Sequence, residues 1–257
     1  MRPSLPSTLL RLPVAHRALH DAGKARPENS RAAIRAAISA GYAIEIDLQL
    51  SSDGCPMVFH DDDLDRLTDE VGPVRARSRA DLRQIPLKGG DGEGIPDLAE
   101  VLELVAGQVP LLIEVKDQDG QMGRNIGALE AAAVKVLEGY EGDMALMSFN
   151  PHSVAELARL APGIARGIVT SAYVPDEWPE LPRAICDDLR NIPDFERSEA
   201  CFISHEASDL ARPRVQALRD AGVPVLCWTI TSPSEEAEAR ALADNVTFEG
   251  YLSPLPT

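Results

Sequence analysis

Three acidic side chains fall near the ends of two predicted strands: Glu45 and Asp47 in one, and Glu114 in another. Carboxylate oxygens are hard ligands, which suit Ca²⁺ or Mg²⁺ rather than Zn²⁺. Without a cation, three carboxylates packed together would repel one another, and their affinity for protons would rise. The sequence therefore predicts that Glu45, Asp47 and Glu114 hold a divalent cation.

Two histidines and two cationic side chains accompany these carboxylates. His16 and His60 each end a predicted strand, Arg17 follows His16, and Lys116 follows Glu114 by two residues. Imidazoles titrate near neutral pH, so one can take a proton while the other delivers a proton to a leaving oxygen. Arg17 can hold phosphate oxygens as a fork and Lys116 as a point charge. Two imidazoles around a cation and a phosphate form the arrangement expected for phosphodiester cleavage.

A β-hairpin is predicted at the second strand. The strand candidates Ala43–Gln49 and Met57–His60 are joined by a connection too short for a parallel crossover. Asp53-Gly54 within this connection is a strong signal for a two-residue turn. The second strand therefore runs past the rim of the sheet and folds back on itself.

This turn sets the expected register of the hairpin. Centring it on Asp53-Gly54 places Asp47 directly opposite His60, with their side chains on one face and their Cβ atoms about 5 Å apart. Glu45, two residues before Asp47, points to the same face. We therefore expect Glu45, Asp47 and His60 to converge at the carboxyl end of this strand.

Short apolar runs alternate with amphipathic segments along the whole chain, a pattern typical of βαβ units and a parallel sheet. Because two of the nine strand candidates form one hairpin, eight remain for an α/β fold of the (β/α)₈ TIM barrel type, in which chemistry sits at the carboxyl ends of the strands. The strand candidates are Leu12–His16, Ala43–Gln49, Met57–His60, Pro110–Lys116, Met144–Phe149, Ile164–Val169, Cys201–Ser204, Val223–Ile230 and Val246–Leu252. The helix candidates are Ser30–Ala40, Leu98–Ala106, Gly127–Glu138, Pro151–Leu160, Leu210–Ala221 and Pro233–Ala243.

One segment interrupts this alternation. Residues 61–96 have no clean period and carry many Gly and Asp residues, which indicates a small insertion after strand two that caps the mouth of the barrel. We interpret its first three residues, 61–63, as a solvated turn. The expected organisation is one barrel domain over residues 1–257, with the insertion at about 61–96.

Composition excludes several classes of function. The net charge of −16 and the lack of a large Lys/Arg cluster argue against nucleic-acid binding. The four cysteines lie far apart, without the spacing of a zinc ribbon, and are expected to be free thiols. No apolar run approaches the length of a membrane span, and the proline-broken N-terminus is a poor signal peptide. We expect a cytoplasmic protein with no stable membrane association; its oligomeric state is not encoded in any motif.

Several short motifs, in this order, resemble the glycerophosphodiester phosphodiesterase family. The resemblance spans nearly the whole chain and is densest over residues 14–68. The motifs are Ala15-His16-Arg17, Pro27-Glu28-Asn29-Ser30, Glu45-Ile46-Asp47, Asp53-Gly54, Val58-Phe59-His60-Asp61, Leu64 through Arg66 to Thr68, Glu114-Val115-Lys116, Ser148-Phe149 and Trp228-Thr229.

The resemblance implies an activity as well as a fold. Family members hydrolyse glycerophosphodiesters, such as glycerophosphocholine, to glycerol 3-phosphate and an alcohol, and they need a divalent cation, often Ca²⁺ or Mg²⁺. The small-molecule diester is thus the expected partner of this chain. The site residues implied are His16 and His60 as acid and base, Glu45, Asp47 and Glu114 as metal ligands, and Arg17 and Lys116 near the phosphate.

Two further positions allow two interpretations each. Glu28 either favours the dipole of the following helix from its first turn or belongs to the substrate site, a role that rests on the resemblance. Trp228 either packs the barrel wall or shapes the pocket of the substrate's headgroup.

The chain departs from the family pattern at two places. The family usually has Gly after His-Arg, where this chain has Ala18, so the backbone there approaches a substrate less closely. Near the C-terminus the family tends to read Asp-Gly, two hydrophobic residues and Thr-Asp, whereas this chain has Glu249-Gly250 and lacks the final Asp. Both departures concern substrate preference more than chemistry.

Two alternative functions remain open on the sequence. A lysophospholipase D-like enzyme would need an apolar mouth for an acyl chain, and the polar segment 61–96 offers little apolar surface. A barrel that binds a phosphorylated ligand without catalysis would be favoured by loss of a histidine or a metal carboxylate, and all five residues are present.

Overall fold

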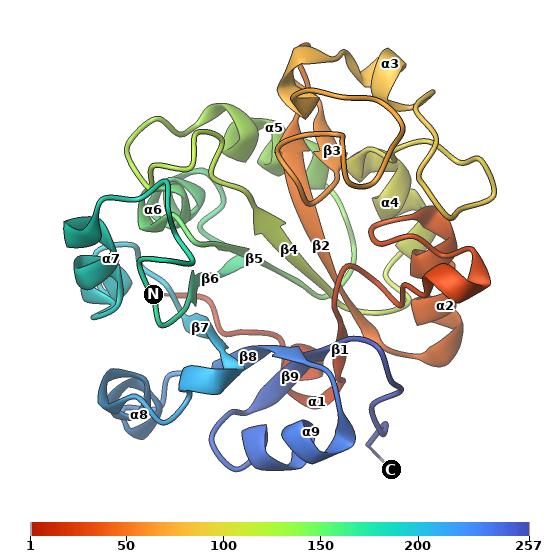
Figure 1. Ribbon diagram of the computed structural model, residues 1–257. Coiled ribbons are helices and arrows are strands. Elements are labelled where there is room, and N and C mark those ends of the chain that lie inside the picture. The colour runs from red at the N-terminus through yellow and green to blue at the C-terminus, as the bar shows by residue number, and fades with distance from the viewer. Residues whose placement is uncertain (1, 257) are drawn as a thin grey trace.

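Eight parallel strands close into a barrel in the computed structural model, which describes residues 2–256 (Figure 1). β1 pairs with β2 on one side and with β9 on the other, which closes the sheet. Helices between the strands form the outer layer, so the predicted (β/α)₈ barrel is confirmed. The strands are β1 (Val14–Ala15), β2 (Ala43–Leu50), β3 (Pro56–Val58), β4 (Leu111–Val115), β5 (Met144–Ser148), β6 (Ala165–Thr170), β7 (Phe202–Glu206), β8 (Val225–Ile230) and β9 (Asn245–Phe248).

Local sequence signals begin and end the helices. α2, for example, starts after Ser30, whose hydroxyl accepts a hydrogen bond from the Ala33 N–H, and ends at Gly41, which has a φ of 79°. The helices are α1 (Ser7–Arg11), α2 (Arg31–Ala40), α3 (Arg79–Leu82), α4 (Leu98–Val105), α5 (Ala128–Leu137), α6 (Pro151–Leu160), α7 (Arg183–Leu189), α8 (Pro213–Asp220) and α9 (Pro233–Ala239), with short 3₁₀ helices η1 (Ala22–Lys24), η2 (Val74–Ala76), η3 (Pro193–Phe195) and η4 (Ala207–Asp209).

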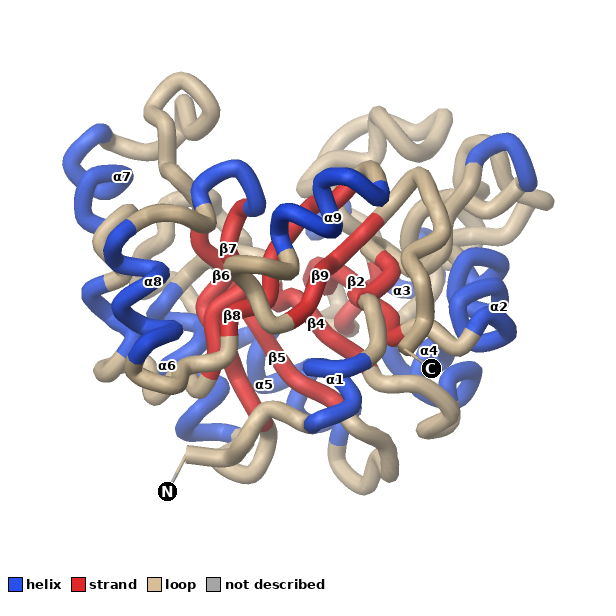
Figure 2. Tube along the Cα trace, turned by 90° about the horizontal axis from the view of Figure 1, so that it is seen from below, coloured by secondary structure: helices blue, strands red, loops and turns tan. Residues whose placement is uncertain are grey.

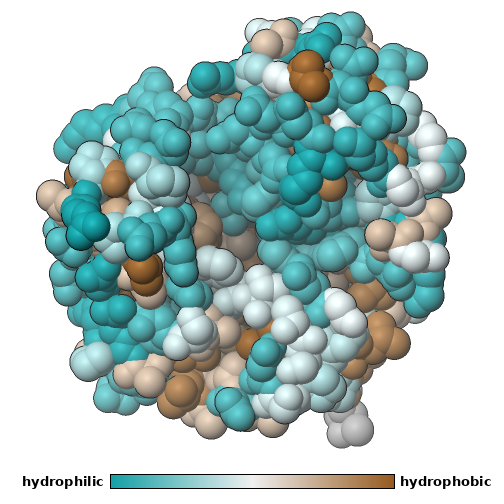
Figure 3. Space-filling model, viewed as in Figure 1, coloured by the Kyte–Doolittle hydropathy of each residue, from teal (hydrophilic) through white to brown (hydrophobic). Residues whose placement is uncertain are grey.

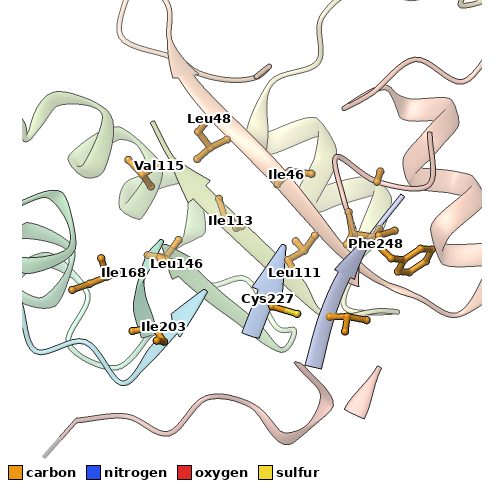
Figure 4. Packing of buried hydrophobic residues seen from close by; sticks show 14 of the residues in the cluster. Ile46, Leu48, Leu111, Ile113, Val115, Leu146, Ile168, Ile203, Cys227 and Phe248 are labelled. Atoms are coloured by element: carbon orange, nitrogen blue, oxygen red, sulfur yellow. The ribbon is translucent and has the colours of Figure 1, made fainter. Parts of the chain in front are cut away.

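Alternate residues of the strands pack into two separate hydrophobic clusters. Ile46, Leu48 and Ile113 belong to the layer between the barrel and the helices (Figure 4). Ala43 and Leu112, from the same strands, belong to the cluster inside the barrel. Because both faces of each strand are covered, a charged side chain on a strand needs a specific partner.

The short helix α1 closes one end of the barrel and was not predicted. Leu5 and Leu9 are buried against the interior cluster, and α1 lies at the lower end of the barrel in Figure 2. The amide of Asn245, on β9, donates hydrogen bonds to the carbonyl oxygens of Leu9 at 2.8 Å and Leu12 at 2.6 Å. These bonds hold the N-terminal segment to the last strand.

The register of the β2–β3 hairpin differs from the prediction by one residue. Leu48 pairs with Val58, and the Phe59 N–H donates a hydrogen bond to the Asp47 carbonyl oxygen at 3.0 Å. The prediction that His60 lies directly opposite Asp47 is therefore wrong. His60 comes after the end of β3 and reaches the mouth of the barrel from a loop.

The turn explains this shift. The Gly54 N–H bonds to the Ser51 carbonyl oxygen at 3.0 Å, and the Ser51 N–H bonds to the Cys55 carbonyl oxygen at 3.0 Å. Gly54 itself has a φ of 78°. These features define a three-residue loop, 52–54, that ends in a left-handed glycine. One additional loop residue moves the whole returning strand by one position.

Gly54→Ala is expected to lower the free energy of unfolding by about 1 kcal/mol, because an L-residue is strained at this φ. No atom lies within 4 Å of the position a Cβ would take, so the loss comes from backbone conformation. Gly163→Ala is the matched control, since Gly163 also has an open Cβ position but no left-handed φ. Urea unfolding of both variants checks the prediction, and equal losses would contradict it.

The segment between β3 and α4 has its own hydrophobic cluster beside the barrel. Phe59, Leu64, Leu82 and Ile95 are buried within it, and it occupies the upper right of Figure 1, together with α3. Asp62, near its start, lines the cavity at the mouth of the barrel.

The other predicted elements agree with the observed ones to within a few residues, with three exceptions. α3 and α7 were not predicted. The last strand stops at Phe248 rather than Leu252, which leaves Glu249 in the loop that follows β9. Across residues 2–256, helices are too short or too polar to traverse a lipid bilayer.

Candidate active site

A cavity of about 560 Å³ opens at the carboxyl ends of the barrel strands. Its charged side includes all five residues predicted as acid, base or metal ligand: His16, Glu45, Asp47, His60 and Glu114. Figure 3, in the same view as Figure 1, shows the molecule hollowed near its centre, with hydrophilic residues along the upper rim.

The strand register explains how the three carboxylates meet. Asp47 on β2 lies beside Glu114 on β4 in the parallel ladder, and Glu45 is two residues before Asp47 on the same face. Oxygen atoms of the three side chains lie within 4.8 Å of one another, and all three residues are buried. The predicted cluster is thus present, because of the β2–β4 pairing rather than the hairpin register.

Lys116 contacts two of these carboxylates. Its Nζ lies 2.8 Å from Asp47 Oδ1 and 2.8 Å from Glu114 Oε1. The pKa of Lys116 is raised, because the neighbouring carboxylates outweigh the opposing effect of burial. The pKa of Asp47 is lowered, although burial alone would raise it, by Lys116, His60 and Arg17.

Glu45 has no such cation. Its Oε2 accepts the backbone N–H of Arg17 at 2.8 Å, but its Oε1 is buried and finds no hydrogen-bond partner among residues 2–256. Burial, followed by the charges of Asp47 and Glu114, raises its pKa well above the usual value. An unpartnered buried oxygen within a set of hard ligands fits a divalent cation.

His16 is oriented by a carboxylate that sequence reasoning did not identify as part of the site. Its Nδ1 lies 2.6 Å from Glu249 Oε2, and Nε2 of His20 lies 3.4 Å from the same oxygen. Burial lowers the pKa of His16, although Glu249 and Asp47 oppose this effect. The only sequence signal for Glu249 was the C-terminal Glu-Gly in place of the family's Asp-Gly.

His60 has an equivalent partner next to it in the chain. Its Nδ1 lies 2.7 Å from Asp61 Oδ1, and Arg66 holds that carboxylate with bonds of 2.6 and 2.8 Å. Asp62 accepts a hydrogen bond from the Gln49 amide at 2.9 Å. Asp62 and Asp63 are exposed, as expected of a solvated turn, whereas Asp61 is partly buried between His60 and Arg66, so the interpretation is wrong for Asp61.

Arg17 and Glu28 belong to one network of ion pairs. Arg17 Nη1 bonds to Glu28 Oε1 at 3.0 Å, and Arg66 bonds to both oxygens of Glu28 at 2.7 and 2.9 Å. Arg17 lines the cavity, whereas Glu28 is not among its described lining residues.

Asn29 is a further site residue that sequence reasoning missed. Its side-chain amide donates a hydrogen bond to Asp47 Oδ2 at 2.9 Å. Because Ser30 caps α2, the Asn29 amide is left for this contact.

The backbone after His16 takes the conformation that glycine favours. Arg17 and Ala18 have φ values of 49° and 63°, and the Ala18 N–H donates to the Glu45 carbonyl oxygen at 3.0 Å. Ala18 therefore occupies a left-handed position that is strained for an L-residue. The left-handed backbone at this position explains why the family usually has glycine there, since glycine adopts a positive φ without strain.

Ala18→Gly is expected to change the free energy of unfolding by less than about 1 kcal/mol, because relief of backbone strain offsets the loss of a buried methyl group. Ala33→Gly is the matched control: Ala33 is equally buried but lies in α2, where glycine costs about 1 kcal/mol in helix propensity as well. Urea unfolding should show a clearly larger loss for the Ala33 variant, and the reverse order would contradict this account.

The opposite side of the cavity is apolar and aromatic. Trp228 on β8 lines it and donates its Nε1–H to the Ser204 carbonyl oxygen at 3.0 Å. Phe149 lies between Trp228 and Trp178, with ring centroids 5.5 and 5.2 Å apart, respectively. Trp228 thus contributes to the cavity wall, and Trp178 is a lining residue that the sequence did not indicate.

Comparisons with known proteins agree with this geometry. Residues 16–247 match the model of the glycerophosphoryl diester phosphodiesterase family. A glycerophosphodiester phosphodiesterase of Caldanaerobacter subterraneus subsp. tengcongensis is 30% identical over 175 residues, which cover 65% of this chain and 70% of the relative. A similar solved structure is an Oleispira antarctica phosphodiesterase in complex with the product sn-glycerol-3-phosphate, with a TM-score of 0.78, 28% identity and coverage of 96% of this chain and 95% of that one.

A glycerophosphodiester phosphodiesterase of Thermotoga maritima has the same fold, with a TM-score of 0.69 at 22% identity over 93% of this chain and 94% of that one. The family match covers strands β2 to β8, most of β9 and every residue of the charged side of the cavity that was predicted from the sequence. The chain therefore belongs to the glycerophosphoryl diester phosphodiesterase family and is a phosphoric diester hydrolase.

Proposed function

We propose that this protein hydrolyses glycerophosphodiesters, such as glycerophosphocholine, to glycerol 3-phosphate and an alcohol in a reaction that depends on a divalent cation. One observation carries the proposal. Two histidines, each oriented by a carboxylate at Nδ1, line the same cavity as a buried carboxylate cluster with an unpartnered oxygen. A general acid, a general base and a cation site are the parts that hydrolysis of a phosphodiester requires.

Glu45, Asp47 and Glu114 would hold the cation. Bound there, it would neutralise and polarise a phosphoryl oxygen. The all-oxygen donor set suits Ca²⁺ and Mg²⁺, and we propose either ion as the cofactor. Asn29 fixes one oxygen of Asp47 by its hydrogen bond, which orients that ligand before a cation arrives.

The histidines divide the proton transfers. We assign His16 as the base, since burial favours its neutral, proton-accepting form. His60 is the acid that protonates the leaving alcohol. In each ring the Nδ1 faces a carboxylate, so Nε2 is the nitrogen left to exchange a proton with the substrate.

Arg17 and Lys116 offset the negative charge that develops on the phosphoryl oxygens. Both line the cavity. Glu28 acts one step away, as a positioning residue that holds Arg17 by an ion pair. Trp228 forms part of the wall against which the rest of the substrate packs.

The four cysteines are free thiols in the described chain, in keeping with a reducing compartment. We propose a cytoplasmic location on this ground.

The experiment that tests the function compares two substrates and identifies the products by mass. Glycerophosphocholine should give glycerol 3-phosphate and choline. Lysophosphatidylcholine, the substrate of the lysophospholipase D-like alternative, should react at least tenfold more slowly. A faster reaction on the lysophospholipid would replace the proposal with that alternative, and tight binding of glycerophosphocholine without any product would favour a non-catalytic barrel.

A further inference from the structure

A second cavity adjoins the catalytic one on its aromatic side. It has a volume of about 470 Å³ and lies over the carboxyl ends of β7 and β8. Glu177, Trp178 and Trp228 line both cavities, so the two share one wall. A substrate bound in the catalytic cavity can extend over this wall into the second one.

Two carboxylates of the second cavity have no cationic partner. Glu177 and Glu206 line it, and neither forms an ion pair with any residue in the range 2–256. No Lys or Arg occurs among its described lining residues. Glu206 is nevertheless held in place, because its Oε2 accepts the Ala172 N–H at 2.9 Å and its Oε1 accepts the Ser208 hydroxyl. In the catalytic cavity, by contrast, Asp47, Asp61 and Glu114 each contact a lysine, an arginine or a histidine.

The shared wall is aromatic and tightly packed. The Trp178 ring packs against Phe149 and Tyr173, with centroid distances of 5.2 and 5.1 Å. Trp228 is anchored by the hydrogen bond that its Nε1–H donates to the Ser204 carbonyl oxygen. Indole rings attract a cation through the negative charge of their faces. Carboxylates without a cationic partner and tryptophan rings together favour an organic cation over a neutral or anionic group.

We propose that the second cavity binds the alkylammonium group of the alcohol half of the diester. The proposal rests on the function proposed above and adds a specificity site built from Trp178, Trp228, Glu177 and Glu206. An acyl chain is a poor occupant, because it would remove water from two carboxylates without pairing them. The same trimethylammonium group occurs in glycerophosphocholine and in the headgroup of lysophosphatidylcholine, and the relative rates on these two substrates distinguish the two sources.

Direct binding can be measured without any catalysis. The chain has two tryptophans, and both line the shared wall, so tryptophan fluorescence reports on this place alone. Choline and its neutral isostere 3,3-dimethylbutan-1-ol are the probes. We expect choline to give a saturable change with a Kd in the millimolar range, and the isostere to bind at least tenfold more weakly. Equal responses, or no saturable response to choline, would overturn the proposal even if the enzyme is active.

Charge-removing variants locate the site. Glu177→Gln and Glu206→Gln should each weaken choline binding severalfold. Glu103→Gln, which removes an exposed charge on α4, is the matched control and should leave the Kd unchanged. Glu177 forms no side-chain hydrogen bond with the described residues, so its substitution remains informative if the Glu206 variant is unstable. An equal loss of choline affinity in all three variants would show that binding responds only to the net charge of the protein, and it would overturn the proposed site.

Turnover supplies the test with substrates. The ratio of kcat/KM for glycerophosphocholine to kcat/KM for glycerophosphoglycerol should exceed ten, and Trp178→Ala or Glu177→Gln should lower this ratio at least fivefold. If lysophosphatidylcholine is the better choline substrate, the cation comes from a lipid headgroup and the site still stands. A ratio near one that the variants leave unchanged would refute the specificity site while the hydrolase function stands. If no diester is cleaved, the function proposed above fails, and the choline titration still decides the cation site.

Discussion

His16→Ala and His60→Ala are each expected to lower kcat for glycerophosphocholine by about 10²- to 10⁴-fold, the range that general acid–base catalysis contributes. Each ring is oriented by a carboxylate at its Nδ1, so truncation removes a group already positioned for proton transfer. His152→Ala is the matched control, because His152 lies on α6, contacts Arg197 and does not line the cavity. Steady-state kinetics and circular dichroism of the three variants would separate lost chemistry from lost folding.

The pH dependence of kcat/KM distinguishes the base from the acid. Burial lowers the pKa of His16, so the neutral form needed in a base persists below pH 6.5, and activity should fall only at more acidic pH. Glu249 acts in the opposite direction and raises that pKa. Glu249→Gln should therefore move the acid limb of the profile further toward low pH. A shift toward high pH, or an unchanged limb, would contradict the assignment of His16 as the base.

Glu45→Gln is expected to abolish both activation by a divalent cation and measurable turnover, a loss of about 10³-fold or more if the ion supplies several kcal/mol. The substitution keeps the shape of the side chain and its bond from the Arg17 N–H, but it removes one charge from the ligand set. Glu141→Gln, an exposed charge away from the cavity, should have no effect. Isothermal titration with Ca²⁺ or Mg²⁺ checks the loss of cation binding, and the rate of product release checks the loss of turnover.

Stability gives an independent measure of the same substitution. The pKa of Glu45 is raised above its value in an unfolded chain, so without a cation this carboxyl costs stability increasingly as pH rises above about 4.5. Cation-free Glu45→Gln should therefore have a higher Tm than the cation-free wild type at pH 8. Added cation should raise the Tm of the wild type only. A lower Tm of the cation-free variant would show that Glu45 has a structural role. A rise in the variant's Tm on addition of the cation would show that the cation binds without the charge of Glu45.

Local sequence patterns predicted the barrel well. The buried strands read as apolar runs, and the glycines that end the helices were visible in the sequence, so the alternation of elements could be followed directly. Glu45, Asp47 and Glu114 were brought together as predicted because the order of parallel strands follows from that alternation. The wrong hairpin register did not affect the prediction of this carboxylate cluster, because the three side chains are brought together by the pairing of β2 with β4.

What sequence reasoning missed depends on contacts between distant segments. Glu249 meets His16 because β9 closes the barrel against β1, a pairing of residues 233 positions apart. Trp178 reaches the cavity from an irregular, proline-containing stretch before α7, for which the sequence offers no periodicity. The Asp53-Gly54 pair correctly indicated a turn, but it did not show that the loop has three residues rather than two, with Gly54 in the left-handed conformation.

The central claim is that cleavage requires the cation held by Glu45, Asp47 and Glu114. The most direct measurement is the release of glycerol 3-phosphate from glycerophosphocholine by chelator-stripped protein, coupled to glycerol 3-phosphate dehydrogenase, with and without added Ca²⁺ or Mg²⁺. We expect no release without a cation, and saturable activation by one of the two ions. Full activity of the stripped protein in excess chelator would contradict the account, as would the absence of release with either ion.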